Sequence, residues 1–329
     1  MTEPTATRVH FYQVGSFAVG NRLLSADDRT VQSNPARTNS IDSGHRACQG
    51  CGEALGARYA LDAAMRATND RLVAVNATGC LEVFSTPYPE TSWRIPWLHS
   101  LFGNAPAVAT GVAAAMRVKG RDDVRVVGQA GDGGTVDIGF GTLSGMFERN
   151  DDVLFICYDN EGYMNTGVQR SGTTPQHAIT TTTPIKGKTQ EKKDMPAIMA
   201  AHGIDYVATA SAAYPLDLFD KITKALSLHG TKYIHIHIPC PPGWGFETRY
   251  SVKLGKAAVE SGYFDLYEIV QGEFRLTGAS EKLVEKRRLV PVQEYLKPQS
   301  RFRILTDEQI AEIQAKVDAK WNGYYQTCE

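Results

Sequence analysis

The sequence predicts an α/β fold, a doubly wound and mostly parallel sheet with helices on both faces. Helical and strand patterns alternate through the middle of the chain, which is typical of parallel sheets. The 329 residues are enough for one large domain with extensions. A long polar stretch also follows one strand, where open α/β sheets bind ligands.

The periodic segments give the order of the expected elements. They are a helix near 53–69, a strand at 72–77, a helix near 105–118, a strand at 124–127, a helix near 137–149, a strand at 153–157, a helix near 215–229, a strand at 233–238 and tail helices near 279–288 and 306–321. The polar stretch from 159 to about 194 is too long for a mere connection, which favours a functional loop.

Three parts of the chain differ in pattern. Residues 1–45 are polar and irregular and predict an N-terminal arm. Residues 46–265 hold the alternating elements and both candidate sites described below, and 266–329 form a C-terminal extension.

Composition excludes several classes of protein. With 42% hydrophobic residues, 22% charged residues and a net charge of −1, the chain has no basic surplus for nucleic acid or an anionic membrane. It opens without a basic run before an apolar segment and contains no stretch of about 18 apolar residues. We therefore expect a cytoplasmic protein without a membrane span. The six cysteines do not form a secreted disulfide pattern and are available as metal ligands.

Two turns with oxygen ligands follow consecutive strands. Gly131, Asp132 and Gly133 form the first, where glycines let backbone N–H groups approach a phosphate. Asn160 and Gly162 follow the next strand. The Asp132 carboxylate, the Asn160 side-chain oxygen and a carbonyl near Gly162 suit a magnesium ion that binds a diphosphate. Each turn alone is ordinary, but at the ends of consecutive strands the two lie side by side.

The segment after the second turn adds two candidates. Asn165 and Thr166 are placed to contact the same ligand, as cofactor-binding residues, with Asn165 also a catalytic candidate. Capping of their own loop is the alternative interpretation.

Four cysteines lie where a metal group would need them. Cys48 and Cys51 share one turn, Cys80 follows the strand 72–77, and Cys240 follows the strand 233–238 in a Pro-rich turn. Four thiolates suit either a tetrahedral zinc or a [4Fe-4S] cluster, and their spacing does not separate the two.

The other two cysteines are not expected to be ligands. Cys157 lies inside an apolar strand and is interpreted as a small buried hydrophobe, and Cys328 as a free thiol in the tail.

Together the two sets resemble the β subunit of the pyruvate:ferredoxin oxidoreductase, or 2-oxoacid:acceptor oxidoreductase, family. The run from Gly-Asp-Gly to a late Asn resembles the thiamine-diphosphate motif, although Asp159-Asn160 stands where many members have Asn-Asn. The resemblance extends over residues 44–48, 78–83, 88–93, 131–184, 239–241 and 294–296. The first forty residues depart from it. It implies a thiamine-diphosphate-binding fold, with thiamine diphosphate, Mg²⁺ and a [4Fe-4S] cluster on the four cysteines.

The resemblance also implies an activity and partners. The activity is oxidative decarboxylation of a 2-oxoacid, pyruvate-like or aromatic such as phenylglyoxylate, to acyl-CoA and CO₂, with electrons leaving through the cluster. In the family, the carboxylate that activates the aminopyrimidine comes from another subunit. We therefore expect a hetero-oligomer with α and γ subunits and a ferredoxin-like subunit, and with a flavoprotein as a further candidate.

Glu53, at the start of the first helix, is a second catalytic candidate that could approach the cofactor. Solvation at the surface, or a favourable charge at the helix N-terminus, explains it equally well. Two alternatives remain for the whole chain. One is a subunit of a non-oxidative thiamine-diphosphate decarboxylase or synthase, and the other is a zinc-stabilised assembly subunit without catalysis.

Overall fold

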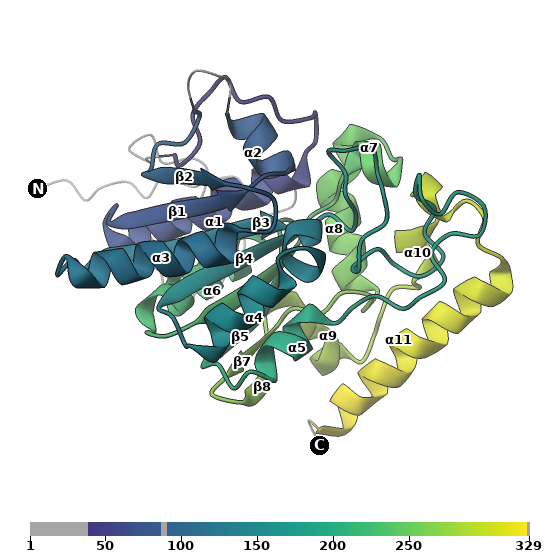
Figure 1. Ribbon diagram of the computed structural model, residues 1–329. Helices are drawn as coiled ribbons and strands as arrows, with labels where there is room; N and C mark the ends of the chain where they lie inside the picture. Colours follow the sequence, from purple (N-terminus) through teal and green to yellow (C-terminus); the bar gives the residue numbers. More distant parts are fainter. Residues whose placement is uncertain (1–38, 87–90, 328–329) are drawn as a thin grey trace, which may run out of the picture.

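A computed structural model describes residues 39–86 and 91–327, and its core is one mixed sheet with helices on both faces (Figure 1). Within these residues the strands are β1 (Leu72–Ala77), β2 (Trp97–Ser100), β3 (Arg125–Gly131), β4 (Val153–Asp159), β5 (Tyr206–Ser211), β6 (Lys232–His237), β7 (Tyr267–Val270) and β8 (Glu273–Leu276). Their order is β2-β1-β3-β4-β6-β5-β7-β8. The first six are parallel, and the β7–β8 hairpin joins β5 in antiparallel orientation.

The helices fall into two layers and a C-terminal group. They are α1 (Gly52–Thr68), α2 (Cys80–Ser85), α3 (Ala105–Val118), α4 (Phe140–Glu148), α5 (Met195–Ala200), α6 (Pro215–Ser227), α7 (Pro241–Trp244), α8 (Ser251–Glu260), α9 (Gly278–Lys286), α10 (Gln293–Leu296) and α11 (Asp307–Thr327). Short turns complete them, a π-helical one at Gly133–Asp137 and 3₁₀ turns at Thr248–Tyr250 and Ser300–Phe302.

Each face of the sheet has its own hydrophobic core. On one face, small residues of α1 and the apolar side of α6 pack on side chains such as Val127 and Ile156. On the other, α3, α4 and α5 cover Val126 and Phe155. Successive strand residues point to opposite faces, so strands buried on both sides need apolar residues at nearly every position. This explains the continuous apolar run of β4, all seven residues of which are buried.

The structure confirms the alternating α/β organisation and the long loop after β4. Residues 160–194 contain no named helix or strand, but many side chains of the loop are buried. The prediction missed β2, β5, the β7–β8 hairpin and short helices including α5 and α8. Cys80, expected in a loop, is instead the first residue of α2. Most of the predicted N-terminal arm lies outside the described residues.

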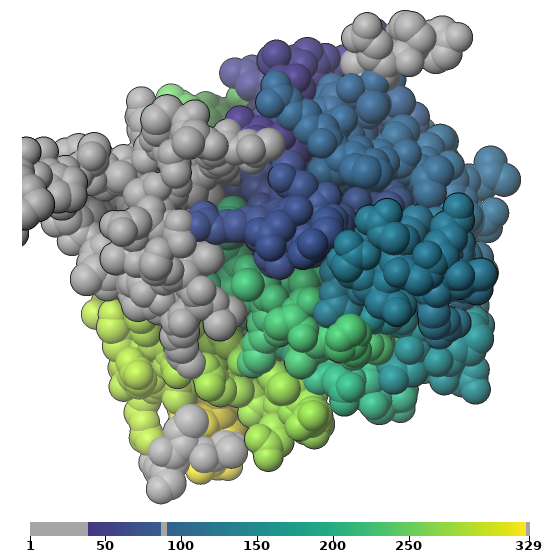
Figure 2. All heavy atoms as spheres, turned by 90° about the vertical axis from the view of Figure 1, so that its left-hand side faces the viewer, coloured from purple at the N-terminus to yellow at the C-terminus, as the bar shows by residue number. Residues whose placement is uncertain are grey.

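The two ends of the sheet lie far apart. β2 is the edge strand at one end and β8 at the other, and Figure 2 shows the blue segment that follows β1 at the upper right and the yellow-green segment that contains β7 and β8 at the lower left. β7 and β8 belong to the expected C-terminal extension, so part of that extension continues the central sheet. Across the described ranges, we find no helix that combines the length and apolarity needed to cross a membrane.

Candidate active site

The two predicted oxygen-ligand turns meet at the carboxyl edge of the sheet. β3 and β4 are parallel neighbours, and Gly131 pairs with Tyr158 at the ends of the strands. Asp132 and Asn160 follow directly, and their side chains are buried. One pocket is lined by all seven predicted cofactor-binding residues and by Glu53 and Cys80. The seven are Gly131, Asp132, Gly133, Asn160, Gly162, Asn165 and Thr166.

Asp132 is oriented by hydroxyl groups of the long loop. Its Oδ2 accepts hydrogen bonds from Ser171 Oγ at 2.5 Å and Thr173 Oγ1 at 2.8 Å. Burial, followed by the charge of nearby Asp159, raises the pKa of Asp132 well above its usual range. A divalent cation at this carboxylate would offset both effects and keep it ionised. The residue therefore fits a metal ligand.

Asn160 and Glu53 form a buried pair in the pocket wall. Asn160 Nδ2 donates to Glu53 Oε2 at 2.9 Å, while Asn160 Oδ1 and Glu53 Oε1 are buried without a hydrogen-bond partner among the described residues. Buried polar atoms rarely lack a partner, so Asn160 Oδ1 suits an oxygen ligand to Mg²⁺. Glu53 is only 3% exposed, so the prediction of surface solvation is wrong.

Burial raises the pKa of Glu53 to about 7, although hydrogen bonds from Asn160 and from the Leu81 backbone act in the opposite direction. The first turn of α1 places this carboxyl inside the pocket because the helix begins at Gly52, after the N-cap Cys51, whose Sγ accepts from Ala54 N at 3.4 Å. The sequence alone did not show that the rest of the protein would bury the side of this helix that carries Glu53.

Glycines bring backbone segments close together beside Asp132. A Cβ on Gly133 would lie 2.5 Å from the Tyr163 ring, and one on Gly139 would lie 2.0 Å from the Gly134 carbonyl oxygen. Tyr163 in turn donates to Asp137 Oδ2 at 3.0 Å. These contacts leave no room for side chains at the two glycine positions. The pocket wall is therefore backbone here, as a phosphate-binding turn requires.

Asn165 and Thr166 lie at the mouth of the pocket and are exposed. Thr166 Oγ1 donates to Gln169 Oε1 at 2.6 Å, and Gln169 Nε2 returns a bond to the Thr166 carbonyl at 2.9 Å. Thr166 thus caps its own loop in this structure, as the alternative interpretation held. Asn165 is directed by no comparable contact and stays a candidate.

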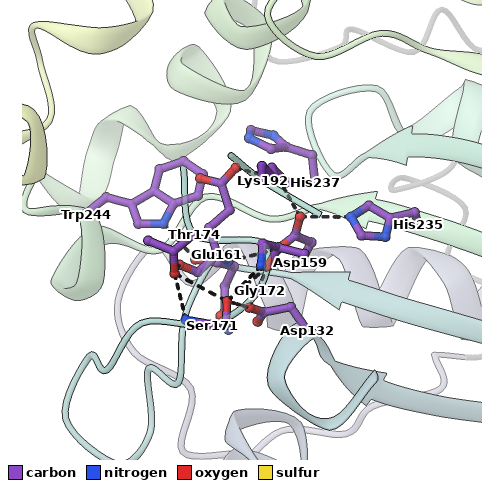
Figure 3. Close-up of polar contacts among 12 residues, drawn as sticks. Asp132, Asp159, Glu161, Ser171, Gly172, Thr174, Lys192, His235, His237 and Trp244 are labelled. Atoms are coloured by element: carbon purple, nitrogen blue, oxygen red, sulfur yellow. Dashed lines mark hydrogen bonds and ion pairs between the residues drawn. The ribbon is translucent and has the colours of Figure 1, made fainter. Parts of the chain in front are cut away.

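A network of charges behind the second turn was not predicted (Figure 3). Lys192 Nζ contacts Asp159 Oδ2 at 2.7 Å and Glu161 Oε1 at 2.8 Å. Arg301 binds the other Glu161 oxygen at 2.6 Å, and His235 Nε2 lies 2.8 Å from Asp159 Oδ2. Burial alone would raise the pKa of Asp159, but Lys192 and His235 outweigh it and hold the pKa far below its usual range.

Three of the four predicted cysteine ligands lie on two turns that touch. Cys51 N donates to the Cys48 carbonyl at 3.1 Å, and Gly52 N donates to the Pro239 carbonyl at 3.1 Å, next to Cys240. A Cβ on Gly52 would lie 2.5 Å from that carbonyl oxygen, so glycine permits the close packing.

The fourth, Cys80, belongs to the same group. Burial, followed by Glu53 and then by Cys240, Cys51 and Cys48, raises the pKa of the Cys80 thiol. Each of these thiols therefore lies within electrostatic reach of Cys80. The described cysteines form no disulfide. Among residues 39–86 and 91–327, no three His, Cys, Asp or Glu side chains gather closely enough to hold a single metal ion.

Cys157 lies apart from this group. It is fully buried in the core beneath α3, α4 and α5, and its interacting neighbours are Asp159, Asp132, Thr135 and Tyr233. Cys328 lies outside the described residues.

Comparison with known proteins agrees with this geometry. The family described as thiamine pyrophosphate enzyme, C-terminal TPP binding domain, matches residues 77–236, which contain both oxygen-ligand turns. A solved structure of a 2-oxoglutarate:ferredoxin oxidoreductase from Magnetococcus marinus superimposes with a TM-score of 0.53 and 26% identity, over 66% of this chain and 79% of that one. The fold and the pocket therefore define a thiamine-diphosphate enzyme.

Curated relatives place the chain more closely. A pyruvate synthase subunit PorB from Methanothermobacter thermautotrophicus is 55% identical over 280 residues, which cover 84% of this chain and 94% of the relative. A ketoisovalerate oxidoreductase subunit VorB from Pyrococcus abyssi is 42% identical over 289 residues, which cover 85% and 90%. The chain belongs to the family of thiamine-diphosphate-dependent 2-oxoacid oxidoreductase β subunits. This family membership argues against both the non-oxidative and the non-catalytic alternative.

Proposed function

We propose that this chain is the β subunit of an enzyme that oxidatively decarboxylates pyruvate, forms an acyl-CoA and CO₂, and passes the electrons to a ferredoxin-type acceptor. One observation carries the proposal. Cys80, a candidate cluster ligand, lines the same pocket as Asp132 and Asn160, the candidate metal ligands. Electrons released at the cofactor would therefore have a short path to the cluster. The identity to pyruvate synthase subunits favours pyruvate over the larger 2-oxoisovalerate and over aromatic 2-oxoacids.

In this proposal Asp132, Asn160 and the carbonyl near Gly162 bind Mg²⁺, and the backbone at Gly131 and Gly133 contacts the diphosphate. Asn160 Oδ1 supports the assignment because it is buried without a partner in the described chain. Bound thiamine diphosphate supplies the electron sink for decarboxylation of a 2-oxoacid. Glu53 fixes the Asn160 amide and forms one wall of the reaction space, and Asn165 closes the mouth of the pocket.

We assign a [4Fe-4S] cluster to Cys48, Cys51, Cys80 and Cys240. Burial raises the pKa of both the Cys51 and the Cys240 thiol to about 12, so iron must displace their protons at neutral pH. A [4Fe-4S] cluster suits an enzyme that passes electrons to an acceptor better than a zinc ion does, because zinc has no redox chemistry.

The proposal includes partner subunits that cover the pocket. Leu101 and Ile138 are 73% and 62% exposed, and both lie beside the pocket. A Cβ on Gly103 would lie 2.7 Å from Ile138, and Phe102 lines the pocket, so the apolar patch adjoins its mouth. Exposed apolar surface next to a half-built site suits a subunit interface. The partner would supply the carboxylate that activates the aminopyrimidine.

The test is anaerobic purification of the complex, with iron, sulfide, zinc and thiamine diphosphate measured per chain. We expect four irons from this chain in addition to those of the ferredoxin-like subunit, one thiamine diphosphate and no zinc, together with CoA-dependent dye reduction that is faster with pyruvate than with 2-oxoisovalerate, 2-oxoglutarate or phenylglyoxylate. One zinc per chain, or decarboxylation without dye reduction, would contradict the proposal.

A further inference from the structure

Lys192 is a half-buried cation, with 28% of its side chain exposed, that the proposed reaction does not use. It lies near the end of the long loop, 33 residues after Asp159, yet its ammonium group returns to the turn that follows β4. Figure 3 shows it between Asp159 and Glu161, below His237. The two carboxylates that it contacts flank Asn160 on both sides, at 2.7 Å and 2.8 Å from Nζ.

This double contact constrains the conformation of the turn. Glu161 has φ of +66°, a left-handed conformation that is costly for a residue with a side chain. Glu161 is 1% exposed, and its carboxylate is shared between Lys192 and Arg301. Asp159 also accepts a bond from the Glu161 backbone N–H at 3.0 Å. The Lys192 ammonium group therefore contacts both residues that flank Asn160 and limits how far they can move apart.

The contacts of Asn160 show what this constraint fixes. Its carbonyl accepts a bond from Trp244 Nε1 at 2.8 Å, and Arg301 stacks over the Trp244 ring with a centroid distance of 3.9 Å. Its Nδ2 is taken by Glu53, so Oδ1 is the one amide atom that is free to bind a ligand. Thr173 links the turn to Asp132. Its Oγ1 lies 2.8 Å from both Asp132 Oδ2 and Asp159 Oδ1, so the two carboxylates share this one hydroxyl donor.

We propose that Lys192 is a positioning residue for cofactor binding, which holds the turn at 159–161 so that Asn160 Oδ1 and Asp132 face the same metal ion. The inference rests on the proposed Mg²⁺ and diphosphate site. Loss of Lys192 alone leaves the buried carboxylates of Asp159 and Glu161 with less compensating charge, so stability should also fall. Residues that orient metal ligands commonly contribute 10- to 100-fold to metal affinity when they are intact. We therefore expect the loss of Lys192 to weaken cofactor affinity by more than its effect on stability explains.

The experiment compares Lys192→Met, Lys192→Arg and wild type in the intact complex. After removal of Mg²⁺ and thiamine diphosphate with a chelator, each protein is titrated with thiamine diphosphate at fixed Mg²⁺ and with Mg²⁺ at fixed thiamine diphosphate. Tryptophan fluorescence reports binding because Trp244 contacts Asn160. We expect K192M to weaken both affinities by roughly 10- to 100-fold. K192R should recover most of the loss. In steady state, K192M should raise the apparent KM for thiamine diphosphate while leaving kcat at saturation close to wild type.

Lys221 provides the matched control. It is 2% exposed and pairs with Asp217 at 2.6 Å, in α6 and away from the pocket. Lys221→Met should lower the melting temperature but keep wild-type cofactor affinity. If K192M and K221M lower the melting temperature equally and neither changes cofactor affinity, Lys192 is only structural and the inference is wrong.

Asp132→Ala separates this failure from failure of the proposed site. If D132A loses binding while K192M keeps it, the site stands and only the role of Lys192 falls. If D132A binds as wild type does, the assignment of the metal site itself is wrong.

Discussion

The oxygen-ligand turns and the cysteine group meet at Cys80, which lines the pocket of Asp132 and Asn160, but the two regions are built in different ways. Asp132 and Asn160 are held by neutral hydroxyls, a carboxyl and a tryptophan before any cofactor binds. The cysteine thiols have few such contacts, and the best is the 3.4 Å bond from Ala54 N to Cys51 Sγ. Cys48 is exposed, whereas both oxygen ligands are buried.

The difference follows from the charges that each region must carry. Carboxylate and amide oxygens can be positioned by the chain alone, because lysine, arginine and hydroxyl groups can balance them. Around the cysteines, burial and Glu53 raise the pKa of the Cys51, Cys80 and Cys240 thiols, so the thiolate form depends on iron. The region around Asp132 and Asn160 is thus preorganised by the chain, whereas in our proposal the cysteine region is completed by the cluster.

The largest expected effect is loss of cofactor from the preorganised region alone. Asp132→Ala should abolish retention of thiamine diphosphate, because its carboxylate is the one charged ligand in the metal set. Iron content should stay near wild type, since the cysteines do not depend on Asp132. Iron and thiamine diphosphate are measured on the same anaerobic sample.

Asp123→Ala is the control for that experiment, because Asp123 lies at the exposed turn before β3 and pairs with Arg121. It should retain both cofactors. If D132A still binds thiamine diphosphate stoichiometrically, Asp132 is not a ligand.

A second, reciprocal effect is expected in the cysteine region. Cys240→Ala should leave three thiolates, from which the cluster is lost or degrades to a three-iron form, while Asp132 and Asn160 are unaffected. The variant should bind thiamine diphosphate and release CO₂ from the 2-oxoacid but fail to reduce a dye. Anaerobic iron content and the electron paramagnetic resonance signal of the reduced protein are the measurements. A fully loaded four-iron cluster with unchanged dye reduction would remove Cys240 from the site and reopen the choice between Cys157 and Cys328.

The parts of the site that could be predicted from the sequence are those that lie in short, continuous motifs. Gly131-Asp132-Gly133 and Asn160 follow apolar strands, and neighbouring parallel strands necessarily bring their carboxyl ends together. β2 and β7 were missed because a strand of only four residues carries little periodic signal.

Lys192 and Arg301 could not be found in the same way. Lys192 lies 33 and 31 residues after its partners Asp159 and Glu161. Arg301 lies 140 residues after Glu161 (301 − 161). Only the folded chain brings these groups together. A Lys-Lys pair in a polar loop is ordinarily read as solvated surface. One signal was available, since Asp159 and Glu161 sit directly after a buried strand and require compensating cations.

A smaller effect is expected when the pH is lowered, and it comes from His237, which lies near the turn at 159–161. Burial lowers the pKa of His237 to about 4. The negative charges of Glu161 and Asp159 act to raise this pKa, and the positive charges of Lys192 and Arg301 act to lower it. As pH falls through 6.5, the unfolded chain takes up a proton at this histidine and the folded chain does not, so stability is lost. Between pH 6.5 and pH 5 the loss should be about 2 kcal/mol.

The measurement for His237 is the free energy of unfolding by denaturant at several pH values. His237→Phe should have a flatter pH dependence in this range, because it lacks the group that stays neutral in the folded chain. Equal slopes for wild type and H237F would show that His237 is not held neutral.

The smallest effect should come from Cys157→Ala, which tests where the cysteine region ends. Cys157 is buried in β4 on the face covered by α4 and α5, where burial and then the charges of Asp159 and Asp132 raise the pKa of its thiol. Removing its sulfur leaves a small cavity in the core, with an expected cost of about 1 kcal/mol in the free energy of unfolding. Iron content, thiamine diphosphate content and dye reduction should match wild type. Loss of iron in C157A with little loss of stability would mean that the cluster extends to the opposite face of the sheet, and that the four ligands were wrongly chosen.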